Sequence, residues 1–196
     1  MSRMATSDYE IGRPGNRCAV SGRDLQVGEV FIGALLDIPE HDELVRVDIC
    51  PEAWEASRGS ELHAVEVTEV RDGEEVRVRR RIFAYWQGVL PESNKKADPL
   101  IGADSLMGIF DSLEGTDEPK RIAFRYVLTL LLVRKRLLSL EGQRPAQGEE
   151  PAVLLVKRKG DAPDEAPLEV TDPGLDEQAI LDVTEQLQAV LNTESE

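Results

Sequence analysis

Residues 62–83 read LHAVEVTEVRDGEEVRVRRRIF. Apolar and polar side chains alternate on both sides of Asp72-Gly73, and this alternation is typical of strands with one buried face. Asp-Gly between two such segments favours a primed two-residue turn. The sequence therefore predicts an antiparallel hairpin that pairs residues 62–70 with residues 75–83.

The second strand of this hairpin should gather cations on one face. Because the side-chain period of a strand is two, one face holds Arg77, Arg79, Arg81 and Phe83, and the other holds Val76, Val78, Arg80 and Ile82. Tyr85 and Trp86 follow directly. We infer an interaction surface from the arginines and aromatics, formed by Arg77, Arg79, Arg81, Tyr85 and Trp86.

Two kinds of partner fit this surface. An unknown protein with an acidic face is the one we favour. Arginines beside aromatic rings can also follow a nucleic-acid backbone and stack on its bases, but the net charge of −15 opposes a polyanion. Acidic side chains nearby, such as Glu66 and Glu75, would pair with the arginines and explain them without any ligand.

Upstream, the sequence predicts a second hairpin from residues 30–36 and 43–49, with a charged, Pro-containing loop at 37–42. A short helical turn begins at Pro51, and Trp54 is its apolar anchor. We expect the two hairpins to expose Trp54, Tyr85 and Trp86.

Two cysteines flank the upstream hairpin. Cys18-Ala-Val-Ser21-Gly22 has the length of a zinc knuckle but Ser21 at the second ligand position, and Cys50-Pro-Glu-Ala53 has Ala53 there. We expect two buried thiols without a ligand. A Cys18–Cys50 disulfide is one alternative, and a zinc set of Cys18, His41, Cys50 and His63 is another.

The segment 16–54 thus resembles a zinc ribbon or treble-clef module that has lost half of its ligands. The whole chain resembles a family of small acidic bacterial proteins with such a degenerate module at the N-terminus. This resemblance implies a β-hairpin module at residues 9–90 followed by a helical part. It implies no metal and no activity.

The second half of the chain should be mainly helical. Asp104 can cap a short helix with Leu106, Ile109, Phe110 and Leu113 on one face, closed by Gly115. A long central helix should begin at Asp117-Glu-Pro119 and run to about Leu140, with Gly142 as its stop. The residues that surround its middle, and that we expect to be covered on several sides, are Val127, Leu128, Leu130, Leu131, Leu132 and Val133.

The predicted fold class is therefore α+β, with a β-rich module at 9–90 and a helical module at 100–192 separated by a polar loop at 91–99. We expect a linker at 143–150 and a small hairpin at 152–170. A last amphipathic helix should pack on the long one through Ile180, Val183, Leu187, Val190 and Leu191.

Charge is segregated along the chain. Residues 161–196 hold eleven acidic residues and no Lys or Arg. Basic residues gather at 77–81 and 120–136. We expect the acidic segment to lie against these basic groups, including the helix at 119–140; the alternative is that one basic group faces an outside partner.

Composition restricts the function classes. The first residues lack an apolar signal segment, and the longest apolar run in the middle of the chain, 126–133, is far shorter than the ~20 residues that a bilayer needs. We therefore expect a cytoplasmic protein with no membrane contact. No nucleophile elbow, phosphate loop or dinucleotide-binding motif occurs, and we expect no catalytic residues and no cofactor.

Our leading hypothesis is a cytoplasmic protein-interaction or adaptor protein. An accessory nucleic-acid-binding or regulatory protein that uses the Arg77–Arg81 strand is the alternative, and an enzyme is the third.

Overall fold

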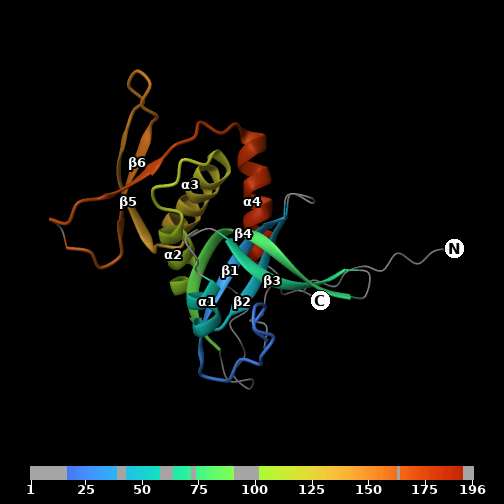
Figure 1. Cartoon of the computed structure of the whole chain (residues 1–196). Coiled ribbons are helices and arrows are strands. Elements are labelled where there is room, and N and C mark those ends of the chain that lie inside the picture. The colour runs from blue at the N-terminus through green and yellow to red at the C-terminus, as the bar shows by residue number, and fades with distance from the viewer. Residues whose placement is uncertain are drawn as a thin grey trace.

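The computed structural model describes residues 17–38, 43–57, 64–71, 74–90, 102–162 and 164–191. Within these ranges the chain forms two antiparallel sheets and four helices. The α+β class expected from the sequence is confirmed. Figure 1 shows the arrangement, with the second sheet standing apart from the first and helices between them.

The first sheet contains β1 (Val30–Ile38), β2 (Glu43–Ile49), β3 (Ala64–Arg71) and β4 (Glu74–Val89) in the order β2-β1-β4-β3. Both hairpins predicted from the alternation are present, because β1 pairs with β2 and β3 pairs with β4. The Asp72-Gly73 turn itself lies outside the described residues.

One long strand serves two partners. Residues 74–81 of β4 pair with β3, and residues 81–89 pair with β1. The register shifts between Leu35 and Leu36, which lie opposite Ala84 and Ile82 and leave Phe83 as the extra residue of a bulge. A bulge bends a strand and exchanges the faces of the residues beyond it.

The bent sheet curls until its two edges meet one residue. Ala19 donates its N–H to the Asp48 carbonyl on β2 at 2.9 Å, and the Thr68 N–H on β3 donates to the Ala19 carbonyl at 3.0 Å. We call the concave face, turned toward Ala19, the inner face and the opposite one the outer face. Ala19 therefore satisfies backbone groups at both sheet edges.

The inner face buries its own apolar cluster. The turn at 18–22, the short helix α1 (Pro51–Ser57) and inner-face side chains meet in this cluster, which includes Cys18, Cys50, Trp54, Val65 and Val67. The predicted helical turn at Pro51 is confirmed. Trp54 is only 5% exposed, so the expectation that it lies on the surface is wrong; it fills the concave side of the curl.

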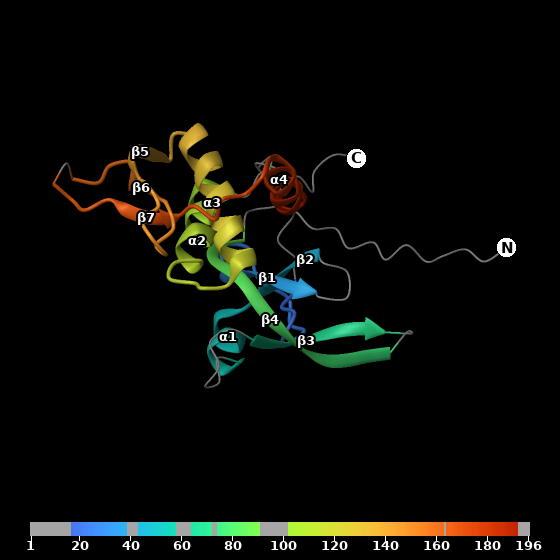
Figure 2. The same cartoon turned by 90° about the horizontal axis from the view of Figure 1, so that it is seen from above.

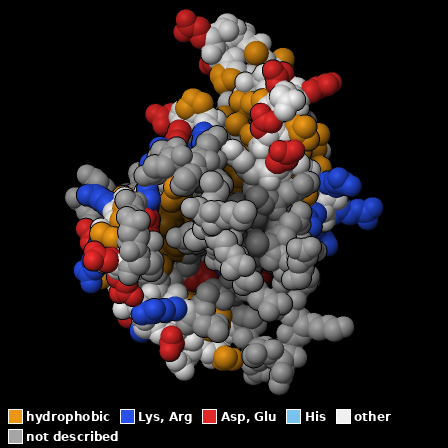
Figure 3. Space-filling view, turned by 90° about the vertical axis from the view of Figure 1, so that its right-hand side faces the viewer, with side chains coloured by type: hydrophobic (Ala, Val, Ile, Leu, Met, Phe, Trp, Pro, Cys, Tyr) orange, Lys and Arg blue, Asp and Glu red, His pale blue; other side chains and the backbone are white. Residues whose placement is uncertain are grey.

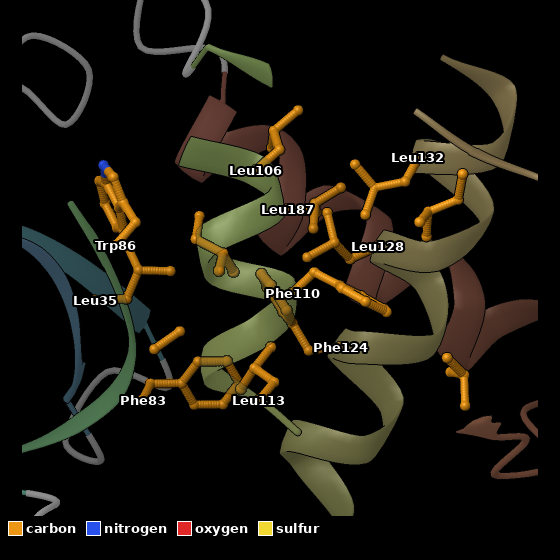
Figure 4. Packing of buried hydrophobic residues seen from close by; sticks show 14 of the residues in the cluster. Leu35, Phe83, Trp86, Leu106, Phe110, Leu113, Phe124, Leu128, Leu132 and Leu187 are labelled. Carbon is orange, nitrogen blue, oxygen red and sulfur yellow. The ribbon is translucent and has the colours of Figure 1, made fainter. Parts of the chain in front are cut away.

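The outer face is covered by helices α2 (Ala103–Ser112) and α3 (Pro119–Arg134). Figure 4 shows Phe83 and Leu35 from the sheet facing Phe110 and Leu113 of α2, with Phe124 of α3 beyond them. The apolar face predicted for α2 is confirmed, since Leu106, Ile109, Phe110 and Leu113 are all buried. These contacts join the first sheet to the helices in one core.

Trp86 belongs to this outer core and is 3% exposed. It is wedged between two glycines: a Cβ on Gly33 would lie 2.4 Å from the indole ring, and one on Gly108 would lie 2.8 Å from the Trp86 Cβ. The sequence predicts an exposed Trp86. That prediction is wrong because α2 packs directly onto it.

The sequence predictions for these helices need two smaller corrections. Asp104 lies in the first turn of α2, and the N-cap position is Gly102. Leu130 of α3 is 41% exposed, because its neighbours α2, the sheet and the last helix leave that side of α3 open. The predicted start of α3 is right, with Glu118 at the N-cap and Pro119 in the first turn.

The long helix ends earlier than the sequence predicts. Arg136 takes a left-handed conformation with φ of 60°. The Arg136 N–H donates to the Val133 carbonyl and the Leu137 N–H to the Leu132 carbonyl, at 3.0 and 2.9 Å. These two bonds form a Schellman closure, which usually has glycine where Arg136 stands. The helix therefore stops at Arg134, and not at Leu140.

The chain then enters the second sheet. Its strands are β5 (Leu138–Arg144), β6 (Val153–Arg158) and β7 (Leu168–Thr171), in the order β5-β6-β7. The predicted pairing within 152–170 is confirmed by β6 and β7. The linker predicted at 143–150 is wrong, because Gln147 and Glu150 exchange backbone hydrogen bonds and close the β5–β6 hairpin.

The last helix, α4 (Glu177–Leu191), begins where Asp176 accepts a hydrogen bond from the Ala179 N–H at 2.8 Å. Its Leu187 is buried in the outer core and Val183 packs against that core. The expected packing on α3 is confirmed for these two residues, and α4 also contacts β2. The side chains of Val190 and Leu191 lie outside the described residues.

The boundary expected at 91–99 between the two modules also lies outside the described residues. The outer core contains residues from both sides of it, such as Leu35 and Leu128. In the described parts of the chain, every helix is too short or too polar to cross a bilayer.

Candidate functional site

Curling of the sheet brings the two cysteines together. The Cys50 N–H donates to the Cys18 Sγ at 3.3 Å, and the Ser21 hydroxyl lies 3.8 Å from the Cys50 Sγ. The Ser21 N–H also donates to the Cys18 Sγ, at 3.4 Å. Both side chains are buried as free thiols. Two sulfurs and one hydroxyl, from Cys18, Cys50 and Ser21, thus lie together at three of the four positions where a zinc ribbon would have its ligands.

The two backbone donors define the electrostatics of Cys18. Burial alone would raise the pKa of its thiol, but the hydrogen bonds from Ser21 and from the Cys50 and Val20 backbone outweigh burial and lower it. N–H groups that point at sulfur stabilise the thiolate, the form that binds metals and acts as a nucleophile. Cys18 is only 1% exposed, however, so its sulfur is shielded from solvent.

A structural zinc needs four N or S ligands. Within the described residues, no group of three or more His, Cys, Asp or Glu is arranged to hold a metal ion. The alternative zinc set was Cys18, His41, Cys50 and His63. The structure describes only its two cysteines, because His41 and His63 lie outside the described residues. Ala53 follows one turn of α1 after Cys50 and offers no ligand.

An ion cluster covers the same turn. Arg23 donates to Glu29 and to Glu52, the latter at 2.9 Å. Hydrogen bonds from Arg23 and from the Gln26 N–H lower the pKa of Glu29 to about 2. This cluster joins the turn, the start of β1 and α1, so these three elements are held together by polar contacts on the surface as well as by apolar contacts inside.

The arginine face of β4 is formed as predicted, but its aromatic half is not. Opposite Val65 and Val67, whose side chains are buried on the inner face, stand Arg80 and Val78, so Arg77, Arg79 and Arg81 point outward. Beyond the bulge the parity is reversed. Tyr85 therefore lies on the inner side, where its ring is 5.3 Å from that of Trp54.

The five predicted interaction residues consequently do not form one surface. Arg77 and Arg79 are exposed. Arg81 is tied to Asp37 and Glu118, Tyr85 faces the opposite side, and Trp86 is buried under α2. Alternation alone could not locate the bulge, because it depends on how β4 passes from one partner strand to the next.

Asp37 is the centre of a buried polar network. Its carboxylate accepts from Arg81 and, at 3.3 Å, from Lys120 on α3, and it is only 5% exposed. Burial would raise the pKa of Asp37, but the two cations together hold it below its usual value. Next to it, Arg121 donates to the Phe83 carbonyl at 2.7 Å. The network ties α3 to the point where β1 and β4 part.

These pairs show how the basic residues are compensated. Arg80 bonds to Glu69, and Arg81 and Lys120 bond to Asp37, all outside the acidic segment 161–196. Of that segment, Glu169 pairs with Arg144 at 2.8 Å. On the face in Figure 3, acidic and hydrophobic side chains share the upper part, and Lys and Arg lie together with further Asp and Glu in the lower part. For Arg80, Arg81 and Lys120, these ion pairs come from other parts of the chain and not from the acidic segment as expected.

No protein-family model, curated protein or solved structure matches this chain. The arrangement of side chains is therefore the basis for every functional argument below.

One residue of interest was missed from the sequence. Arg125 lies in the buried part of α3 and is 8% exposed. Its signal was available, because Arg125 interrupts the helix face that it shares with the apolar residues Ile122 and Leu128.

Proposed function

We propose that this chain is a cytoplasmic protein-interaction protein without catalytic activity, and that its contact surface is the outer face of the β3–β4 hairpin. The observation that carries this proposal is the projection of that hairpin from the body, seen in Figure 2. Its tip half pairs only with itself, since β1 ends opposite Arg81.

The hairpin has two different faces. Val65 and Val67 bury its inner face against the turn at 18–22, which holds the hairpin in place. On the outer face Glu66, Thr68, Arg77 and Arg79 are exposed. A paired strand that carries two guanidinium groups loses little backbone entropy on binding, and Arg is enriched at protein interfaces.

An acidic protein surface fits this face better than a nucleic acid does. Base stacking needs aromatic rings beside the cations, and the bulge places Tyr85 on the opposite side of β4 while α2 buries Trp86. The net charge of −15 also repels a polyanion.

A charge-reversed variant, Arg77→Glu/Arg79→Glu, tests the proposal in crosslinking and affinity capture from native lysate. A partner captured by the wild type should be lost by this variant. The matched control is Arg134→Glu/Lys135→Glu, which reverses two exposed charges at the end of α3 and should keep the partner. Equal capture by both variants would refute the assignment of the hairpin.

The nucleic-acid alternative is decided by fluorescence anisotropy with labelled single-stranded DNA and RNA at low salt. We expect no binding. Saturable binding that weakens with salt and is abolished by Arg77→Glu/Arg79→Glu would replace the protein partner with a nucleic acid.

We further propose that residues 18–57 are a treble-clef-like module that is stable without zinc. The order of turn, hairpin and short helix, and the two N–H groups that point at the Cys18 sulfur, support this proposal. Metal analysis of protein purified without chelator should find no stoichiometric zinc. The variant Ser21→Cys/Ala53→Cys should acquire one, because it supplies the two missing thiolates.

A further inference from the structure

A cavity of about 380 Å³ lies between the α2–α3 loop, α3 and β7. Figure 2 shows α3 and β7 side by side at this place. Its walls are of two kinds: Ile122, Pro167 and Leu168 provide apolar surface, and Thr116 and Thr171 provide hydroxyl groups. A volume of this size is in the range of small-molecule sites.

Arg125 lies at the wall of this cavity. Its Nε donates to the Phe110 carbonyl and its Nη1 to the Glu169 carbonyl, both at 3.3 Å. The guanidinium also stacks on the Phe110 ring, 4.5 Å from the centroid. A guanidinium has five N–H donors, so the described residues accept only two of them, at long distance, and Nη2 has no acceptor among them.

The counter-charges of Arg125 among the described residues act only at a distance, from Glu114 and Asp111. In the described part of the chain no carboxylate comes within ion-pair distance of it. Asp111 pairs with Arg158 at 2.7 Å and Glu169 pairs with Arg144, whereas Glu114, which also lines the cavity, attracts the Arg125 charge without forming an ion pair. Burial lowers the pKa of Arg125. Buried charges in proteins are normally paired, since an unpaired one costs several kcal/mol.

One alternative is that Arg125 only caps α2. The Phe110 carbonyl is among the last of that helix, and the negative end of the helix dipole stabilises a cation. This role uses Nε, and Nη1 spends one N–H on the Glu169 carbonyl at 3.3 Å, so the second N–H of Nη1 and both of Nη2 are available at the cavity. A planar fork of this kind matches the geometry of a carboxylate.

We infer that this cavity binds a small organic monocarboxylate, whose carboxylate is held by the Arg125 guanidinium and whose apolar body lies on Ile122, Pro167 and Leu168. A monoanion fits better than a phosphate dianion, because the carboxylate-bearing residues Glu114 and Glu169 also line the cavity.

The test is a titration of the full chain followed by amide NMR shifts, with three probes: isobutyrate, its neutral analogue isobutyramide, and inorganic phosphate. Isobutyrate should cause saturable shifts at Gly115, Thr116 and Thr171, and the other two should not. Saturable shifts of equal size with isobutyramide would show an apolar cavity without carboxylate recognition. Tighter binding of phosphate, or no saturable shift with isobutyrate, would also overturn the inference.

Variants locate the binding group. Arg125→Met should weaken isobutyrate binding by roughly ten- to a hundredfold, as expected for the loss of a charge-assisted pair. Arg121→Met is the matched control, because Arg121 lies one turn earlier on α3 and donates to Phe83 and Ile82 carbonyls away from the cavity. An equal loss in both variants would overturn the assignment. The contrast between isobutyrate and isobutyramide needs no variant and holds even if Arg125→Met does not fold.

Discussion

Replacing Gly33 by alanine tests the packing at the centre of the molecule. The added Cβ would lie 2.4 Å from Cε2 and Cζ2 of Trp86 and 2.9 Å from its Nε1. Ordinary carbon contacts are about 3.5–4.0 Å, so the indole would have to move by more than about 1 Å. Gly108 on α2 and the Arg46 guanidinium, 5.2 Å from the ring centroid, enclose the ring and leave it little room.

The expected cost follows from two opposing effects. Alanine in a strand gains about 0.5–1 kcal/mol over glycine because it restricts the unfolded chain. Overpacking usually costs about 1–3 kcal/mol and occasionally more; because the Trp86 ring is enclosed, we take about 4 kcal/mol for this site. We expect Gly33→Ala to lower the free energy of unfolding by about 3 kcal/mol. For a chain of this length the corresponding fall in Tm is roughly 6–12 °C.

Urea denaturation, followed by far-UV circular dichroism and by tryptophan fluorescence, measures this change. Gly142→Ala is the control, since its Cβ would meet only the Leu155 Cδ1 at 4.0 Å; it should be neutral or slightly stabilising. In the double variant Gly33→Ala/Trp86→Phe the clashing indole atoms are gone, so the two substitutions should couple. If Gly33→Ala is as stable as the wild type, Trp86 is not held between β1 and α2 and the packing described above is wrong.

Three further predictions concern polar groups. Asp37 has a folded pKa below its unfolded value of about 3.9; its stabilisation is therefore complete above that value and is lost as the pH falls through the folded pKa. Asp37→Asn should cost about 2 kcal/mol at pH 7, and this cost should shrink as the pH is lowered through the folded pKa; urea melts that gave the same difference at pH 7 and at every lower pH would contradict this. Cys18→Ala should cost about 1–2 kcal/mol in the same assay because two N–H groups lose their acceptor, whereas a chelator should leave the Tm of the wild type unchanged. Arg136→Gly should raise the free energy of unfolding by about 1 kcal/mol, since glycine adopts the left-handed conformation without strain; a loss of stability would mean that the Arg136 side chain makes contacts that outweigh the strain.

Local pattern was enough for much of this fold. The alternation in 62–83 and the apolar runs at 30–36 and 43–49 predicted strands and their pairing correctly, and the spacing of Leu106, Ile109, Phe110 and Leu113 predicted the buried face of α2. In these segments the side chains that must leave water repeat with the period of the backbone. Periodicity therefore reports burial wherever an element has one clear apolar face.

Other features were decided only when distant parts of the chain met. The bulge at Phe83 exists because β4 leaves β3 and joins β1, and it moves Tyr85 away from the arginines. The end of α3 at Arg134 depends on a left-handed Arg136, which pattern reading expects only of glycine. Closure of the curl by Ala19 places Cys50 beside Cys18, and the packing of α3 on β7 leaves Arg125 at a cavity without a carboxylate partner. Each of these depends on the summed contacts of several elements. A sequence read along its length reports which side chains are apolar, and it does not report which ones will face each other.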